Sequence, residues 1–167
     1  MFQQIVVGDS IFLPKLNQAV MLDQAKTFLV YEFVKDARIK DINFGEKFVQ
    51  WFSRKIESGV PECEYLVHPL SLKASDQLIL DSIQREGRQS ISYLAHIAIL
   101  WQRQRYGQAG ILANSGHILT AYALDSANIL RNIAFYRGGG TWNFEAYEAN
   151  RNQEAGTHVL SHVVTRS

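Results

Sequence analysis

The chain has 167 residues, of which 47% are apolar and 20% are charged, and its formal net charge is +1. These values predict one globular domain, residues 1–167, that buries roughly 70% of its unfolded surface, and they exclude the disordered and fibrous classes of protein. A net charge so close to zero provides no global field that would attract nucleic acid or an anionic membrane.

Cys63 is the only cysteine, so the chain forms no intramolecular disulfide and no cysteine-cluster metal site. We expect neither a metal nor a cofactor, because phosphate-loop and dinucleotide-binding motifs are also missing. The N-terminus lacks the basic leader of a signal peptide, and the longest strongly apolar run, residues 97–101, is far shorter than the roughly 20 residues of a membrane span. These features favour a cytoplasmic protein that does not enter a membrane.

The N-terminal region predicts short elements of mixed type. Residues 2–7 indicate a buried strand that ends at Gly8. Residues 17–35 carry apolar side chains close to a helical period, although residues 28–31 would also suit a strand.

The most regular apolar stripe of the chain follows. Asn43 can cap a helix here, and Gly59 and Pro61 would end it. The large apolar side chains recur at the spacing of one helical face: Phe44, Phe48, Trp51, Phe52 and Ile56. We therefore expect these five side chains to form one face of a core helix.

Alternation predicts a strand over residues 63–68 that Pro69 ends. Cys63 and His68 would lie on opposite faces of this strand, so they would form no local nucleophile–base pair. Two helices should follow, residues 76–85 with Ser75 as the cap, and residues 90–106.

The next segment leaves two alternatives open. Residues 111–124 fit either a hairpin with its turn at 114–116, or the start of a long helix from Ser115 to Arg137. A shorter helix over residues 125–137 is expected in either case, because its apolar residues follow a helical period.

Residues 141–147 and 158–164 alternate and are rich in aromatic or β-branched residues, which is typical of strands. The expected fold class is therefore α+β, a single compact domain of about five helices and about four short strands. No regular β-α-β alternation supports a doubly wound sheet.

Three consecutive glycines, Gly138, Gly139 and Gly140, lie between Arg137 and Trp142. A turn after the predicted helix explains them, with Gly138 as the helix stop. Alternatively, their amides and the Arg137 guanidinium would form a binding loop for a phosphate or carboxylate group. Since a buried turn rarely needs three glycines, we expect the loop to lie at a functional surface.

His158 and His162 form a second candidate site, with Glu145 and Glu148 as nearby carboxylates. On a helix the two histidines would meet, whereas on the strand that we favour they share a face roughly 13 Å apart, too far to bind one metal ion. A catalytic role for these four residues would make the protein a hydrolase or a nuclease.

Aromatic and cationic residues alternate over residues 101–107, where Arg103, Arg105 and Tyr106 are candidate binding residues. Such a surface stacks on bases and contacts phosphates, but arginines also stabilise the C-terminal end of an ordinary helix. Nucleic-acid binding is therefore possible but not favoured.

The favoured function is a non-enzymatic interaction or assembly module that binds a protein partner or self-associates. Tyrosine, tryptophan and arginine dominate the energetics of protein interfaces, and they gather here in residues 101–106 and 136–147. The hydrolase or nuclease is the first alternative, and a nucleic-acid-binding protein is the second.

Overall fold

The computed structural model describes residues 6–7, 10–11, 19–38, 42–105 and 118–166. Its main element is a seven-stranded sheet with the order β3-β7-β13-β9-β10-β11-β5. The β13–β9 and β11–β5 pairs are parallel, and the other neighbours are antiparallel. In sheet order the strands are β3 Val20–Leu22, β7 Glu62–Pro69, β13 His158–Arg166, β9 Leu119–Leu124, β10 Leu130–Gly138, β11 Thr141–Glu148 and β5 Ile42–Phe44.

Three pairs of shorter strands and four helices complete the described structure. The strand pairs are β1 Val6–Val7 with β2 Ser10–Ile11, β4 Ala25–Leu29 with β6 Ile56–Val60, and β8 Ala74–Ser75 with β12 Asn152–Gln153. The helices are α1 Val30–Arg38, α2 Glu46–Phe52, α3 Asp76–Arg85 and α4 Leu94–Arg105.

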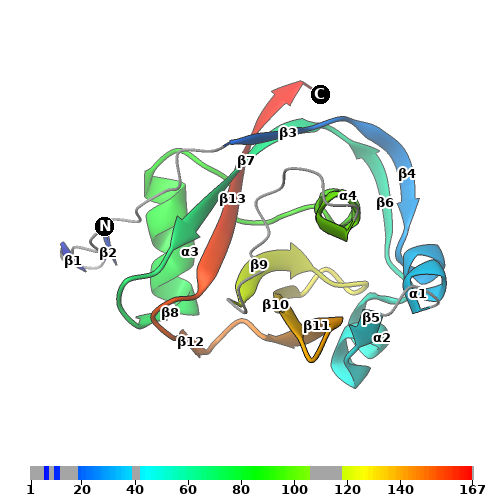
Figure 1. Ribbon diagram of the computed structural model, residues 1–167. Coiled ribbons are helices and arrows are strands. Elements are labelled where there is room, and N and C mark those ends of the chain that lie inside the picture. The colour runs from blue at the N-terminus through cyan, green and yellow to red at the C-terminus, as the bar shows by residue number, and fades with distance from the viewer. Residues whose placement is uncertain (1–5, 8–9, 12–18, 39–41, 106–117, 167) are drawn as a thin grey trace.

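A bent two-stranded ribbon encloses helix α4. The chain runs from β3 into β4 and returns from β6 into β7, so that the β4–β6 pair continues the β3–β7 pair around a bend. Pro61 lies between β6 and β7, where a residue without a backbone N–H suits an interruption of the ladder. Figure 1 shows this ribbon arching over α4, with β9, β10 and β11 on the other side of the helix.

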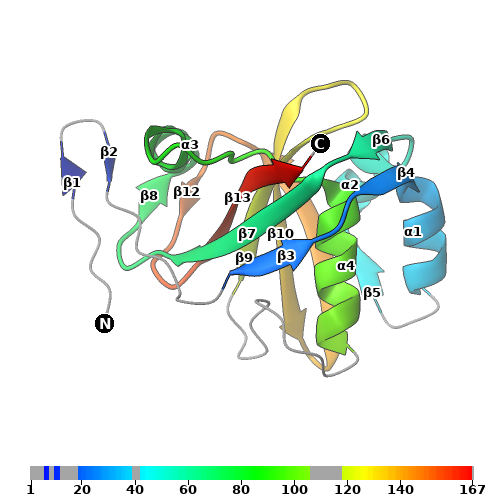
Figure 2. The same ribbon diagram turned by 90° about the horizontal axis from the view of Figure 1, so that it is seen from above.

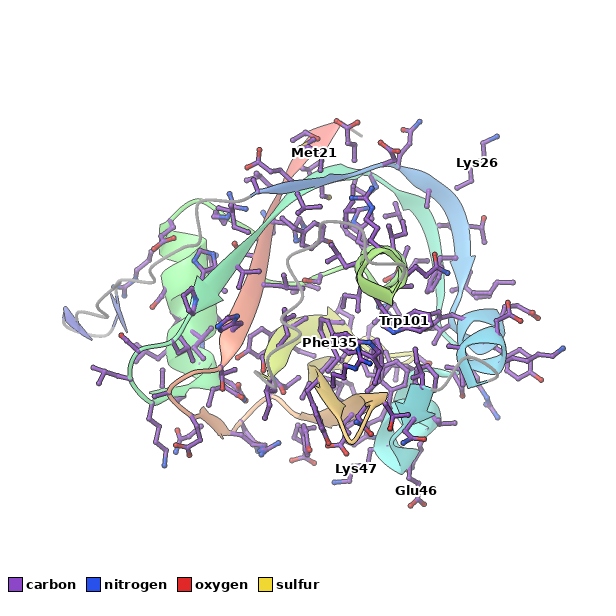
Figure 3. The ribbon with its side chains drawn as sticks, viewed as in Figure 1. Met21, Lys26, Glu46, Lys47, Trp101 and Phe135 are labelled. Atoms are coloured by element: carbon purple, nitrogen blue, oxygen red, sulfur yellow. The ribbon has the colours of Figure 1, made fainter. Side chains whose placement is uncertain are left out.

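The sheet has a hydrophobic core on each face. Helices α3 and α4 lie on opposite sides of β7 and β13 (Figure 2). Alternation along β7 directs Cys63, Tyr65 and Val67 into the larger core around α4. Figure 3 shows Trp101 of α4 and Phe135 of β10 together in this larger core, which also holds Phe48 and Phe52 of α2.

The expected count of about four strands is wrong, because a seven-stranded sheet alone exceeds it. The largest error is the predicted helix over residues 125–137. Asp125 Oδ1 instead accepts bonds from the amides of Ala127 and Ile129 in a turn, and β10 begins at Leu130. The apolar residues of this segment fit the helical period of 3.6 residues. In the structure, however, Ile133 and Phe135 are buried at the strand period of two residues.

The predicted five-residue helical stripe is also wrong in part. Helix α2 covers only residues 46–52, and Phe48 and Phe52 are its buried residues. Phe44 belongs to β5, and Ile56 begins β6 with its side chain 61% exposed. Apolar side chains from three different elements thus produced a spacing that resembles one long helix.

Residues 17–35 contain both of the structures considered for them, since β3 and β4 precede α1. The expected helix over residues 90–106 begins later, at Leu94, and in residues 111–124 the described part is a strand, β9. Residues 1–5 and 111–117 of the predicted N-terminal strand and hairpin lie outside the described residues.

Four other predicted elements are confirmed. Strands β7, β11 and β13 cover residues 63–68, 141–147 and 158–164, and α3 covers 76–85. The Ser75 hydroxyl caps α3 by accepting a hydrogen bond of 3.1 Å from the Leu78 amide. None of the helices in the described residues combines the length and the apolar composition that a membrane crossing requires.

Candidate functional site

The three glycines form the turn of the β10–β11 hairpin. Gly138 pairs with Thr141, and the two residues between them, Gly139 and Gly140, have φ angles of +62° and +82°. Two successive positive φ angles define a type I′ turn, which matches the twist of paired strands. The turn and Arg137 are exposed, whereas Trp142 packs in the core and is only 7% exposed.

The histidines and glutamates of the second candidate site do not converge. His158 and His162 are on β13 and Glu145 is on β11, with β9 and β10 between these strands, which separates them by about 14 Å. Glu145 and Glu148 are three residues apart on one strand, so they lie on opposite faces of the sheet. The described residues contain no group of three or more metal-ligating side chains.

Glu145 is already engaged by its neighbours. The Tyr147 hydroxyl donates to Oε2 over 2.5 Å, and the Tyr136 hydroxyl donates to Oε1 over 3.4 Å. The Arg151 guanidinium lies over the Tyr147 ring, 3.9 Å from its centre. These contacts fix a polar surface on β10 and β11 and leave no carboxylate oxygen of Glu145 without a partner.

The arginine-rich helix end is only partly described. Arg103 is half-buried on α4, and the neighbouring Trp101 is buried in the core, 1% exposed. The side chain of Arg105 and the whole of Tyr106 lie outside the described residues. The described portion therefore contributes one arginine to this predicted surface and no exposed aromatic ring.

A cleft of about 370 Å³ opens at the N-terminal end of helix α4. Four segments that are distant in sequence meet there: the start of β6, the connection between α3 and α4, the end of β9, and the second half of β13. The cleft is lined by Lys55, Glu57, Ser58, Gln89, Ile91, Ser92, Tyr93, Leu124, His162 and Val164.

Glu57 holds the first turn of α4 against the cleft. Its Oε2 accepts from the Leu94 amide over 2.9 Å, and its Oε1 accepts from the Ala95 amide over 2.8 Å. The carboxylate thus satisfies two helix amides and complements the positive end of the helix dipole. The Lys55 ammonium is 3.6 Å from Oε2 and also donates to the carbonyl oxygen of Leu124.

Two buried polar atoms of the cleft have no hydrogen-bond partner among the described residues. They are the Ser92 hydroxyl oxygen and the His162 Nδ1. Both residues are only 2% exposed, and both line the same cleft. Because most buried polar groups in native proteins are hydrogen-bonded, two such atoms at one cavity need an explanation.

A network behind the cleft fixes the aromatic and imidazole rings. His96 Nε2 lies 3.0 Å from the backbone carbonyl oxygen of Asp23, so Nε2 carries the proton and donates. His96 Nδ1 then accepts from the Tyr65 hydroxyl over 3.0 Å, and that hydroxyl accepts from the Tyr93 amide over 3.3 Å. The Tyr65 and Tyr93 rings contact the His162 ring, with centres 5.1 and 5.6 Å from it.

Burial shifts the pKa values of the titratable side chains in the cleft. Burial, His96 and Arg88 together lower the pKa of His162 to about 4, so the imidazole is neutral at pH 7. Burial also lowers the pKa of Lys55, an effect that Glu57 opposes. Perturbed groups gathered in a cavity are a physical indicator of a functional site.

On the opposite face of the sheet, Arg88 is held by a buried serine–histidine pair. The Ser161 hydroxyl is 2.6 Å from His68 Nε2, and Arg88 Nε donates to the same hydroxyl oxygen over 2.7 Å. Both Ser161 and His68 are 0% exposed, so this pair cannot reach a substrate. Its role is to position the Arg88 cation.

Sequence reasoning singled out His162 but missed Lys55, Glu57 and Ser92 as its neighbours. The two-residue spacing of Lys55 and Glu57 is typical of one face of an extended segment, and this signal could have been found. No local pattern links that segment to the start of α4 or to β13, because the bent ribbon brings them together. Comparison of the chain with protein-family models, with curated proteins and with solved structures found no match.

Proposed function

We propose that this protein binds a small polar molecule in the cleft at the N-terminal end of α4. The observation that carries the proposal is a pair of buried polar atoms, Ser92 Oγ and His162 Nδ1, that have no hydrogen-bond partner among the described residues and belong to residues lining one cavity of about 370 Å³. Leaving such a group unsatisfied costs about 1–3 kcal/mol, and a bound molecule that supplies hydrogen-bond partners would offset that cost.

Binding is favoured over hydrolysis by the state of the Ser92 hydroxyl. A serine nucleophile is activated by a hydrogen bond to a base, and Ser92 has no such bond among the described residues. The carboxylates of the hydrolase or nuclease alternative, Glu145 and Glu148, lie on another strand, away from His162.

The interaction module and the nucleic-acid-binding protein remain predictions. Two of the aromatic side chains that suggested an interface, Trp101 and Trp142, are packed in the core. The exposed polar surface around Tyr136 and Tyr147 has its carboxylate and hydroxyl groups bonded to one another. At the α4 cleft, two described polar side-chain atoms are buried beside a cavity and have no hydrogen-bond partner among the described residues.

The test compares a variant that fills the cleft with one that does not. Val164 lines the cleft and is 47% exposed, so Val164→Trp should fill the cavity without disturbing the core. Leu72 is 52% exposed and does not line the cleft, which makes Leu72→Trp the matched control. A library of small polar fragments is screened against both variants and the parent protein by saturation-transfer NMR.

We expect a set of fragments that bind the parent protein and Leu72→Trp but lose their signal with Val164→Trp. The proposal is overturned if no fragment distinguishes the two tryptophan variants while both unfold at the same temperature as the parent protein.

A further inference from the structure

The hydrogen-bonding capacity of the cleft is unbalanced toward donors. Both oxygens of Glu57 already accept bonds from α4 amides. The Lys55 ammonium has three N–H groups, of which one donates to Leu124 and one points to Glu57, so a third is available. The Ser92 hydroxyl, which has no partner among the described residues, adds a second donor. A ligand that complements this cleft must therefore bring acceptors.

The charges around the cleft also favour an anion. Two positive groups face the negative charge of Glu57, namely the Lys55 ammonium and the positive end of the α4 dipole. Arg88 contributes a further positive charge that acts on His162. Glu64 and Glu86 attract the Arg88 cation, so the positive character of the cleft itself comes from Lys55 together with the α4 dipole.

The rim of the cleft is apolar. Ile91 and Val164 are 41% and 47% exposed, and both line the cavity, as does the half-buried Leu124. Exposed aliphatic side chains beside a cavity provide a surface for an apolar part of a ligand. The polar groups lie deeper than these side chains, since Ser92 and His162 are each only 2% exposed.

We propose that the ligand of the α4 cleft is a small monocarboxylate with an apolar body, a proposal that rests on the proposed binding function. Its carboxylate is held by the Lys55 ammonium, the Ser92 hydroxyl and the His162 imidazole. Its apolar body lies on Ile91, Leu124 and Val164. Each oxygen of the carboxylate accepts from at least one of these donors, which supplies the partners that Ser92 and His162 lack.

His162 links this binding to pH. Its titratable and charged surroundings are Tyr65 on β7, Tyr93 and His96 at the start of α4, Arg88 before α4, and Lys55 and Glu57 beside β6. Burial, His96 and Arg88 disfavour the imidazolium in the free protein, and a carboxylate beside the ring would favour it. Binding therefore takes up a proton at His162, and affinity rises as the pH falls.

The experiment uses three probes of one shape and different charge: benzoate, benzamide and benzylamine. Dissociation constants are measured by NMR titration of the full chain, with Val164→Trp and Leu72→Trp as before. We expect benzoate to bind about tenfold more tightly than benzamide, because charge-assisted hydrogen bonds are roughly twice as strong as neutral ones. Benzylamine should not bind measurably.

The pH arm uses His162→Gln, whose amide can still donate a hydrogen bond but cannot be protonated. In the parent protein the affinity for benzoate should rise between about pH 7.5 and about pH 5.5, where benzoate stays ionised. His162→Gln should bind benzoate with an affinity that does not change over this range.

Each unexpected result contradicts a different part of the proposal. Benzamide binding as tightly as benzoate, or an absence of benzoate binding, overturns the carboxylate assignment, while fragments displaced by Val164→Trp would keep the proposed binding function. An affinity for benzoate that is independent of pH in the parent protein overturns the placement of the carboxylate at His162. If Val164→Trp displaces no fragment at all, the binding function itself fails.

Discussion

At the scale of single residues, the buried environment of His162 overrides the ordinary pKa of an imidazole. An imidazole with an ordinary pKa of 6.5 would be partly charged near neutral pH, but burial lowers the pKa of His162 to about 4, with contributions from His96 and Arg88. The ring is held between Tyr65 and Tyr93, so it cannot move to solvent without breaking these contacts. The folded protein therefore keeps His162 neutral, and the free energy that this costs depends on pH.

The unfolded chain binds a proton at His162 below about pH 6.5, whereas the folded protein does so only below about pH 4. Stability is therefore lost as the pH falls through this window, by about 2 kcal/mol between about pH 7 and about pH 5 from His162 alone. Urea unfolding at both pH values should show that His162→Gln is less sensitive to acid than the parent protein by this amount. His96, whose pKa burial also lowers, is present in both proteins and cancels in the comparison.

An equal loss of stability in both proteins would show that the folded state does not suppress the protonation of His162.

At the scale of secondary-structure elements, the β10–β11 hairpin replaces a predicted helix and its glycine stop. The turn requires a positive φ angle at Gly139 and Gly140, which glycine adopts without a steric penalty. A Cβ atom added at Gly139 would meet nothing within 4 Å, so only the backbone conformation restricts that position. A substitution at Gly139 therefore tests the backbone conformation of the turn rather than its packing.

Gly139→Ala should reduce the free energy of unfolding by about 1–2 kcal/mol, because alanine disfavours the left-handed region. Gly139→Asn should cost only a few tenths of a kcal/mol, since asparagine tolerates that region and is common in type I′ turns. Thermal unfolding of the two variants beside the parent protein measures the difference. Similar losses in both variants would contradict a type I′ turn at this position.

At the scale of the whole molecule, α4 is the centre around which the ribbon and the sheet are packed. The buried side chains of its inner face, Leu94, Ile97 and Trp101, belong to the larger core. Two contacts tie the ribbon to the helix start: Glu57 to the first amides of α4, and the Asp23 carbonyl oxygen to His96. Loss of packing at α4 should therefore destabilise the entire domain.

Trp101→Ala should reduce the free energy of unfolding by about 3–5 kcal/mol, because it leaves a large cavity in the core. Lys26→Ala is the control, since Lys26 is exposed on the outer side of the ribbon (Figure 3) and should change stability by less than about 0.5 kcal/mol. Both values follow from urea unfolding. A cost below about 1 kcal/mol for Trp101→Ala would contradict its position in the core.

The sequence by itself determined the elements whose signals are local. Alternation identified β7, β11 and β13, and the Ser75 cap identified α3, because strand periodicity and capping depend on neighbouring residues only. It also placed His158 and His162 on one strand, too far apart to share a metal ion.

Only the tertiary structure decided which chain segments pair and which side chains meet. Residues 125–137 fit a helical period, but pairing with β9 and β11 made the part from Leu130 onward a strand, since burial between two neighbours outweighs a weak helix preference. The candidate site required Lys55, Ser92 and His162 to meet. In the sequence, Ser92 is 37 residues after Lys55, and His162 is 70 residues after Ser92. The bent ribbon around α4 creates that meeting, and a bend is a property of packed strands rather than of any local run of residues.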